Sequence, residues 1–127
     1  MGTLNELSRE MLVRFTQIDY RREMALVAIV GQGGLARQHG VARYAINPDL
    51  RSCEFALVVS DELRKQGIGT RLMKALMESA RDEHGLRVMA GTVLARNAPM
   101  LQLMRDLGFS IAPDPDDSEV RIVEREL

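Results

Sequence analysis

The segment at residues 64–70, Arg-Lys-Gln-Gly-Ile-Gly-Thr, combines residue types that favour the binding of an anion. Gly67 and Gly69 lack a Cβ atom, so phosphate oxygens could approach the backbone closely there. Arg64 and Lys65 place positive charge beside them, and free backbone N–H groups at the start of a following helix would add to the attraction. The pattern predicts a pyrophosphate cradle made of Arg64, Lys65, Gln66, Gly67, Ile68, Gly69 and Thr70.

Two common nucleotide-binding motifs do not fit this segment. A P-loop ends in Gly-Lys-Ser/Thr, whereas Gly69 is followed by Thr70 with no lysine between them. A dinucleotide fingerprint needs glycine or alanine three residues after Gly69, and that position is Leu72. The alternative to a pyrophosphate cradle is a turn in which the glycines serve only a steric purpose.

The segments on either side of the loop have the patterns of a strand and a helix. Residues 53–60 are apolar and rich in β-branched side chains, which is typical of a buried strand. After the loop, apolar residues recur at helical spacing at Ile68, Leu72, Met73, Leu76, Met77 and Ala80. A loop between a strand and a helix would place its backbone N–H groups where an anion binds.

The remaining segments predict the element order α-β-β-β-α-β-α-β. Further strands are predicted at residues 24–30, 41–46, 88–94 and 120–124. A second long apolar periodicity follows Asn97 and ends at Gly108, the expected glycine at a helix C-terminus. A first helix is predicted from the spacing of Leu7, Met11, Phe15 and Ile18.

The loop resembles the acetyl-CoA loop of the GNAT N-acetyltransferases, Arg/Gln-x-x-Gly-x-Gly/Ala. Its defining positions are filled by Arg64, Gly67 and Gly69. Farther along, an asparagine, a helix and the pair Gly108-Phe109 follow a strand in the order and spacing of that family. The resemblance implies one GNAT domain over residues 1–127, with the α/β (α+β) fold of acyl-CoA N-acyltransferases, a mixed central sheet flanked by helices.

The same resemblance implies acetyl-CoA as the acyl donor and no metal ion. Backbone groups around Val58 and Val59 would pair with the amides of the pantetheine arm, and Asn97 would reach that arm as well. Asn97 could also cap the helix that carries Pro99 near its start, and the two roles are compatible.

Several segments narrow the resemblance to the GNAT domain of the bacterial Pat-type protein lysine acetyltransferases. These segments are residues 14–20, 22–28, 40–43, 54–56 and 114–117. The narrower resemblance implies a protein lysine as the acceptor, with acyl-CoA synthetases as the substrate proteins. The strand and helix that normally open the domain are expected to be missing here, with residues 1–6 a disordered or foreign start. The second strand would then have an exposed edge, which predicts self-association through it.

Glu54 is the candidate general base for acyl transfer. An amine must be neutral to react, and deprotonating a lysine of pKa ~10.4 at pH 7 costs about 4–5 kcal/mol. A nearby carboxylate can take the proton directly or through a water, and partial burial in a strand would raise the pKa of Glu54. The alternatives are a solvent-facing residue or one paired with an arginine. Cys53 is expected to be a small core residue on the opposite strand face.

Several other residues have side chains, or stand at positions, that could take part in chemistry. Many GNAT enzymes carry a tyrosine as general acid where this chain has Met104, so no general acid is evident. His39 and His84 are interpreted as local structural residues. Asp19, Tyr20 and Glu23 could line an acceptor site or could equally cap or brace the first helix. The cluster at residues 114–119 predicts a solvated loop.

Composition excludes several classes of function. The chain has 127 residues and a formal net charge of −1, which argues against nucleic-acid binding. It contains no apolar run of membrane-spanning length and no signal peptide, so we expect a cytoplasmic protein with no membrane partner. One cysteine excludes an internal disulfide and a zinc site. A small-molecule amine acetyltransferase and a CoA-binding sensor or interaction module with little turnover remain as alternatives.

Overall fold

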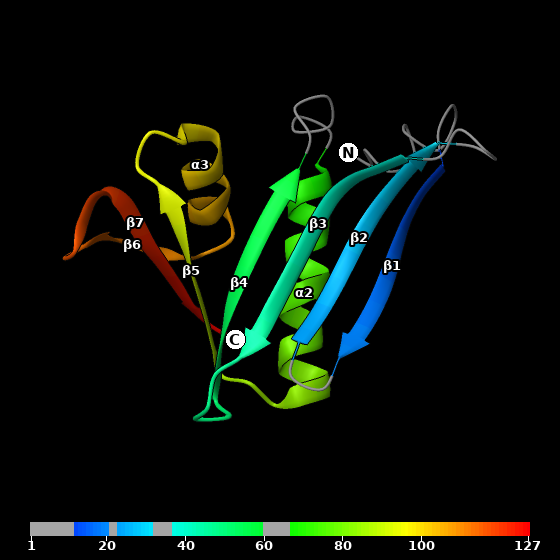
Figure 1. Cartoon of the computed structure of the whole chain (residues 1–127), viewed down its shortest axis with the longest axis horizontal. Coiled ribbons are helices and arrows are strands. Elements are labelled where there is room, and N and C mark those ends of the chain that lie inside the picture. The colour runs from blue at the N-terminus through cyan, green and yellow to red at the C-terminus, as the bar shows by residue number, and fades with distance from the viewer. Residues whose placement is uncertain (1–11, 21–22, 32–36, 60–66) are drawn as a thin grey trace.

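The computed structural model describes residues 12–20, 23–31, 37–59 and 67–127 of the chain. The described elements are β1 (Leu12–Tyr20), β2 (Glu23–Gly31), β3 (Arg37–Ile46), β4 (Ser52–Val59), α2 (Ile68–His84), β5 (Val88–Leu94), α3 (Ala98–Asp106), β6 (Ser110–Asp114) and β7 (Asp117–Glu126). The predicted mixed sheet with flanking helices is therefore confirmed (Figure 1).

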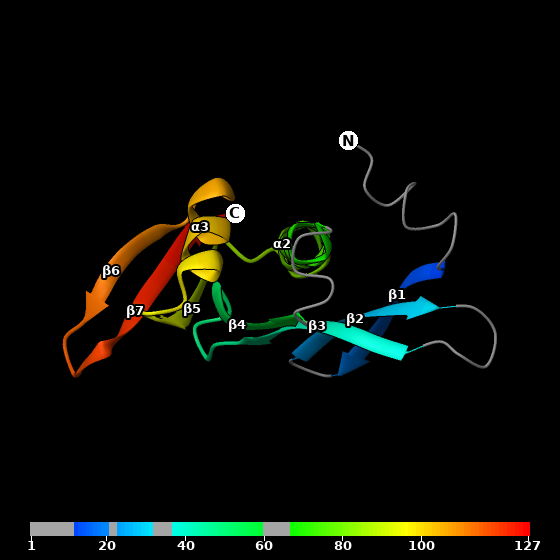
Figure 2. The same cartoon turned by 90° about the horizontal axis from the view of Figure 1, so that it is seen from above.

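All seven described strands form one sheet in the order β1-β2-β3-β4-β5-β7-β6. Neighbouring strands are antiparallel except for β4 and β5, which are parallel. The parallel pair is connected through α2, as a crossover connection between parallel strands requires. Figure 2 shows both helices on the same side of the sheet, and no described element covers its other face.

The core lies between α2 and the sheet. The apolar face of α2 is fully buried through Ile68, Leu72, Met73, Leu76 and Ala80. It packs against β2, β3 and β4, whose inward-facing residues Met24, Tyr44 and Cys53 are also fully or almost fully buried. Burying each large apolar side chain stabilises the fold by about 1.5–3 kcal/mol. Ser79, the polar residue buried in this interface, shares a hydrogen bond of 3.1 Å with the hydroxyl of Tyr44.

Left-handed glycines mark both ends of α2. Gly67 precedes the helix with φ 77°, and Gly85 follows it with φ 63°. At the C-terminal end, the Gly85 N–H donates to the carbonyl of Arg81 and the Leu86 N–H donates to the carbonyl of Ala80. These bonds satisfy carbonyl groups that the end of a helix leaves free, so the loop before α2 and the turn after it are set by residues that adopt positive φ readily.

The predicted first helix is wrong where it can be examined. Residues 12–18 belong to β1, which pairs antiparallel with β2 from Leu12↔Gly31 to Tyr20↔Glu23. The spacing of Phe15 and Ile18 fits a helix, but the segment is rich in β-branched and aromatic residues and lies two residues before β2. Pairing with a neighbouring strand outweighed the weak helical periodicity. Leu7 and Met11 lie outside the described residues.

The edge that the sequence analysis expected to be exposed is covered. Because β1 pairs with β2, and β3 pairs with both β2 and β4, each of the strands predicted at 24–30 and 41–46 has a neighbour on both sides. Among the described strands the free edges belong to β1 and β6. Self-association through the second strand therefore has no open edge to use.

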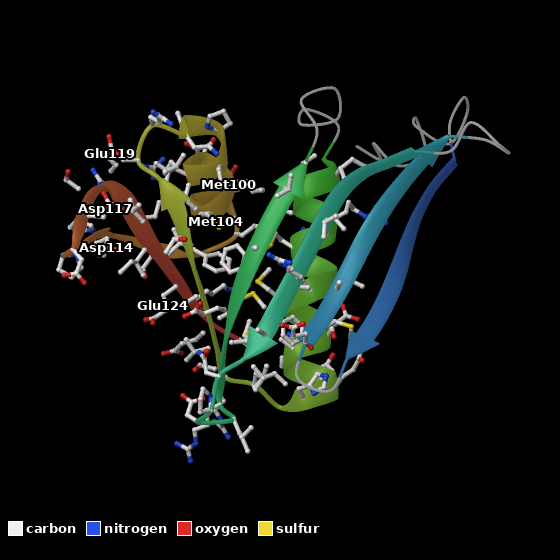
Figure 3. The ribbon with its side chains drawn as sticks, viewed as in Figure 1. Met100, Met104, Asp114, Asp117, Glu119 and Glu124 are labelled. Atoms are coloured by element: carbon white, nitrogen blue, oxygen red, sulfur yellow. The ribbon has the colours of Figure 1, made fainter. Side chains whose placement is uncertain are left out.

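The sequence analysis also missed β6. This strand has five residues and contains Pro113, which cannot donate a ladder hydrogen bond and is tolerated at a sheet edge. Of the predicted solvated loop at 114–119, only residues 115–116 form a turn, which is exposed, whereas Asp114 ends β6 and residues 117–119 begin β7. Figure 3 shows Asp114, Asp117 and Glu119 around this turn, away from the gap between α3 and β4.

Candidate functional site

The parallel strands β4 and β5 are joined over a short distance only. Their register pairs are Ser52↔Val88, Cys53↔Met89 and Glu54↔Ala90. Beyond Glu54 the two strands separate, as Figure 1 shows, and the side of β4 that faces β5 has no strand partner among the described residues. Backbone N–H and C=O groups on that side are available to a ligand that enters the fork.

A cavity of about 540 Å³ occupies this fork. Apolar side chains line much of it, and the polar groups of its lining come from Thr70, Asn97 and the backbone. The lining residues are Leu57, Val58, Val59, Gly67, Gly69, Thr70, Asn97, Pro99, Met100 and Leu103. We call this cavity the fork cavity. None of its described lining residues has a side chain that titrates near neutral pH.

The structure brings most of the predicted donor-site residues to the fork cavity. Val58, Val59, Gly67, Gly69 and Thr70 line it although they come from a strand and from the start of α2. The side chain of Ile68 belongs to the core instead, because it is fully buried. Arg64, Lys65 and Gln66 lie outside the described residues.

The first turn of α2 is suited to an anion. The first bond that closes a helical turn there is donated by the Arg71 N–H to the carbonyl of Gly67, at 3.1 Å. The N–H groups before Arg71 have no partner within the helix. No described side chain caps this end and no acidic residue lies in its first turn, so the positive end of the helix dipole is suited to attract a phosphate group.

Gly69 allows α3 to approach this turn. A Cβ atom at this position would lie 3.1 Å from Leu103 Cδ2 and 3.7 Å from Val59 Cγ2. Both of these side chains line the fork cavity. A side chain at position 69 would therefore press against Leu103 and Val59 in the lining of the fork cavity, beside the first turn of α2.

The side-chain carbonyl oxygen of Asn97 caps the N-terminus of α3. Its Oδ1 accepts a hydrogen bond of 3.2 Å from the Met100 N–H, and Pro99 lies in the first turn. A carbonyl oxygen in this role leaves the two N–H donors of the side-chain amide free. Asn97 also lines the fork cavity, so the structure is compatible with capping and ligand binding together, as the sequence analysis expected.

Glu54 lies on the open face of the sheet, outside the fork cavity. Its side chain is exposed, so the expected partial burial is wrong. No described arginine forms an ion pair with it. It lines a second hollow of about 370 Å³ on that face, bounded by Glu23, Met24, Ala25, Arg43, Tyr44, Ala45, Glu54, Phe55 and Ala56. We call this second hollow the face hollow.

Both cavities are lined by β4. Residues 54–56 line the face hollow and residues 57–59 line the fork cavity. Because alternate residues of a strand share a face, Val58 of the fork cavity lies on the same exposed face as Glu54 and Ala56 of the face hollow. A thioester held beside Val58 would therefore lie on the face of β4 that carries the carboxylate of Glu54.

The other chemically interesting residues take structural positions. Cys53 is fully buried, and burial raises the pKa of its thiol to about 12, so the predicted core role is confirmed and the thiol is not a nucleophile at neutral pH. Met104 is fully buried in the core, and Figure 3 shows it on α3 with Met100. His84 is the last residue of α2 and packs edge-on against Tyr44. The side chain of His39 lies outside the described residues.

Sequence reasoning missed the part played by Arg43 in the face hollow. Arg43 was part of a resembling segment but was given no role. In β3 it shares a face with Ala45, which pairs with Glu54. The signal that could have found it is the period of two along a strand, which places alternate residues on one face.

Comparisons with known proteins agree with this arrangement. The sequence profile of the Acetyltransferase (GNAT) family matches residues 6–109. Acetyltransferase PA5475 of Pseudomonas aeruginosa is 36% identical over 118 residues, which are 93% of this chain and 63% of that protein. The L-methionine sulfoximine/L-methionine sulfone acetyltransferase of the same organism is 30% identical over 115 residues, 85% of this chain and 64% of that protein. The chain thus spans less than two thirds of the length of either relative.

A solved structure supports the fold. The GNAT domain of PAT from S. lividans superposes with a TM-score of 0.73 and 24% identity, covering 90% of this chain and 66% of that one. At this level of identity the likeness concerns the arrangement of strands and helices, and it leaves the acceptor open.

Proposed function

This chain is a member of the GNAT family of acetyltransferases, and on that premise we propose that it transfers an acetyl group from acetyl-CoA directly to a primary amine. The observation that carries the proposal is that successive residues of β4 line two cavities, with a carboxylate on the acceptor side. One cavity has the features of a donor site and the other has room for an amine.

Acetyl-CoA would lie in the fork cavity. Its pyrophosphate would bind at the first turn of α2, where Gly67 and Gly69 leave the backbone accessible. Its pantetheine arm would run along the unpaired side of β4 and exchange hydrogen bonds with the backbone at Val58 and Val59. The side-chain amide of Asn97 has free donors for a carbonyl oxygen of the same arm.

The chemical step would need one base. The nitrogen of the neutral amine attacks the thioester carbonyl carbon, a C–N bond forms, and the C–S bond breaks. The proton lost by the nitrogen goes to the carboxylate of Glu54, directly or through a water, and then to solvent. The CoA thiolate leaves and takes a proton from solvent, because the described lining of the fork cavity offers no acid.

Two classes of acceptor are supported by different observations. A small-molecule amine is supported by the relative that is named for acetylating L-methionine sulfoximine and sulfone. A protein lysine, as in Pat-type enzymes acting on acyl-CoA synthetases, is supported by the exposure of Glu54 on an open sheet face, where a long side chain could arrive. We place the small-molecule amine first, since the face hollow is bounded and has the volume of a small ligand.

The proposal includes a cellular location and the class of partners. Neither described helix is long and apolar enough to cross a membrane. We expect the protein to act in the cytoplasm, where acetyl-CoA is available, without a nucleic-acid partner.

The test combines binding with turnover. Calorimetric titration with acetyl-CoA measures donor binding, and release of free CoA is followed with L-methionine sulfone, the common L-amino acids, simple alkylamines and a lysine peptide. Binding together with acceptor-dependent release is expected. Binding without release from any amine would indicate a sensor module and overturn the proposal, and absence of binding would show that the loop before α2 serves only as a turn.

A further inference from the structure

The face hollow carries a positive charge that transfer to a simple amine does not need. A base such as Glu54 is sufficient for an alkylamine or a lysine side chain, and a second cation beside it would repel the protonated amine as it enters. Yet Arg43 lines the same hollow with its side chain exposed to solvent. No described residue forms an ion pair with Arg43, which leaves its guanidinium available to a ligand.

The register of the sheet fixes how these groups are spaced. Ala45 pairs with Glu23 on one side and with Glu54 on the other, so these three residues form one row across β2, β3 and β4. Arg43 forms the next row, between Ala25 and Ala56. Paired residues lie on one face of a sheet. Arg43 is therefore the diagonal neighbour of both carboxylates, at about 7–8 Å between backbone positions.

Small side chains make room between the charged ones. The positions around Arg43 in the two rows are alanines, Ala25, Ala45 and Ala56. Long side chains at Glu23, Arg43 and Glu54 consequently surround a depression floored by methyl groups. The described part of the chain thus brings a guanidinium and a carboxylate, from diagonally neighbouring positions, to the lining of one space of about 370 Å³.

We propose that the acceptor is an α-amino acid whose carboxylate binds Arg43 and whose amine faces Glu54. This inference rests on the proposed acetyl transfer and names its substrate class. An amino acid carries a carboxylate and an amine on one carbon. The cationic Arg43 is complementary to the carboxylate, and the anionic Glu54 is complementary to the amine. The planar guanidinium is suited to a carboxylate because it donates two parallel hydrogen bonds.

Glu54 rather than Glu23 would take the amine. Glu54 belongs to β4, which lines both the face hollow and the fork cavity, whereas Glu23 lies two strands away on β2. An amine beside Glu54 is next to the place where the thioester would lie. Glu23 would instead contribute to the negative potential that attracts the ammonium form.

The experiment compares each acceptor with its carboxamide. The chain and its Arg43→Gln variant are assayed for CoA release with the common L-amino acids and L-methionine sulfone, each as the free acid and as the amide. Arg105→Gln is the matched control, because Arg105 is an exposed arginine on α3, outside both cavities. Arg43→Lys tests whether a cation with a different shape retains part of the preference for the free acid over the amide.

The expected result is a preference for the acid that depends on Arg43. Loss of a charged hydrogen-bond partner should raise KM for the best acid about 10- to 100-fold in Arg43→Gln, with a smaller change in kcat. KM for the amide should stay unchanged, and Arg105→Gln should behave as the unmodified chain does. Equal turnover of acid and amide, or an equal loss for both in Arg43→Gln, would overturn the inference and leave acetyl transfer intact. Absence of CoA release with every amine would overturn the proposed function and this inference together.

Discussion

Glu54 pairs with Ala90 at the last register position that β4 and β5 share. The residue proposed as the base therefore marks the point where the two strands separate, three residues before Leu57, the first residue of β4 that lines the fork cavity. A thioester held along the open side of β4 would end close to this point. The position of the carboxylate is thus a consequence of strand register, and it does not depend on a long side chain reaching in from a loop.

Replacing Glu54 with glutamine should remove turnover and keep donor binding. The amide cannot accept a proton, and loss of a general base costs about 10²- to 10⁴-fold in rate. The measurements are CoA release and calorimetric titration with acetyl-CoA. Glu124→Gln is a matched control, because Glu124 is exposed on β7 and also pairs with Ala90 (Figure 3), yet it does not line the face hollow. A similar rate loss in both variants would contradict a specific role for Glu54.

Substitutions at Asn97 should separate capping from ligand binding. Serine is as good an N-cap as asparagine, so Asn97→Ser should keep the free energy of unfolding within a few tenths of a kcal/mol, whereas Asn97→Ala should lose about 1 kcal/mol. Both variants lack the side-chain amide donors and should bind acetyl-CoA more weakly, by about 0.5–1.5 kcal/mol. Urea unfolding and calorimetry give the two quantities. Unchanged affinity in Asn97→Ser would restrict Asn97 to the cap.

The buried thiol should make the fold less stable in alkali. Burial raises the pKa of Cys53 to about 12 from its ordinary 9.0, so between these values the unfolded chain has lost a proton that the folded chain keeps. The free energy of unfolding then falls as pH rises through this window. Urea unfolding at pH 8 and pH 10 should show a smaller fall in Cys53→Ala than in the unmodified chain. The same burial predicts slow alkylation of the folded protein, and rapid alkylation without denaturant would contradict it.

Leu50 is a site where a substitution should stabilise the protein. This exposed residue lies in the turn between β3 and β4 with φ 60°, a conformation that leucine adopts at a cost. The turn is held by the Asp49 carboxylate, which accepts hydrogen bonds from the Arg51 and Ser52 N–H groups, and these bonds lower the pKa of Asp49. Asparagine tolerates positive φ, so Leu50→Asn should raise the free energy of unfolding by about 0.5–1 kcal/mol.

A control variant, Leu50→Ala, keeps the backbone strain at positive φ and removes only the exposed apolar side chain. Leu50→Ala should change stability little, because alanine has the same difficulty with positive φ. If alanine stabilises as much as asparagine, exposed apolar surface rather than backbone strain explains the gain. Thermal and urea unfolding would both record the difference.

Much of the fold was predictable because its elements carry strong local patterns. The apolar face of α2 follows from the helical spacing of its apolar residues. The helix predicted from Phe15 and Ile18 is wrong because the apolar spacing of this segment fits a strand as well as a helix. The segment forms a strand because β2, which follows in the chain, pairs with it. The edge strand β6 was missed because it is short and interrupted by Pro113.

The donor site was easier to predict than the acceptor site for a physical reason. Residues of the loop and the first turn of α2 are contiguous, so one motif contains them. Glu23, Arg43 and Glu54 come from three different strands, and their proximity depends on the pairing register of β2, β3 and β4. Sequence patterns alone do not determine that register, so the charge of Arg43 beside Glu54 was visible only in the structure.

The three residue pairs between β4 and β5 form the only strand pairing between the two halves of the described sheet. Acetyl-CoA bound between β4 and β5 would form hydrogen bonds with the unpaired side of β4 and would so connect the two halves of the sheet. Ligand that binds only the folded chain adds RT ln(1 + [L]/Kd) to its stability, about 2.7 kcal/mol at a hundredfold excess over Kd. We expect acetyl-CoA to raise the melting temperature and to slow hydrogen exchange at the backbone amides of Leu57, Val58 and Val59. The substrate would then complete the sheet that binds it.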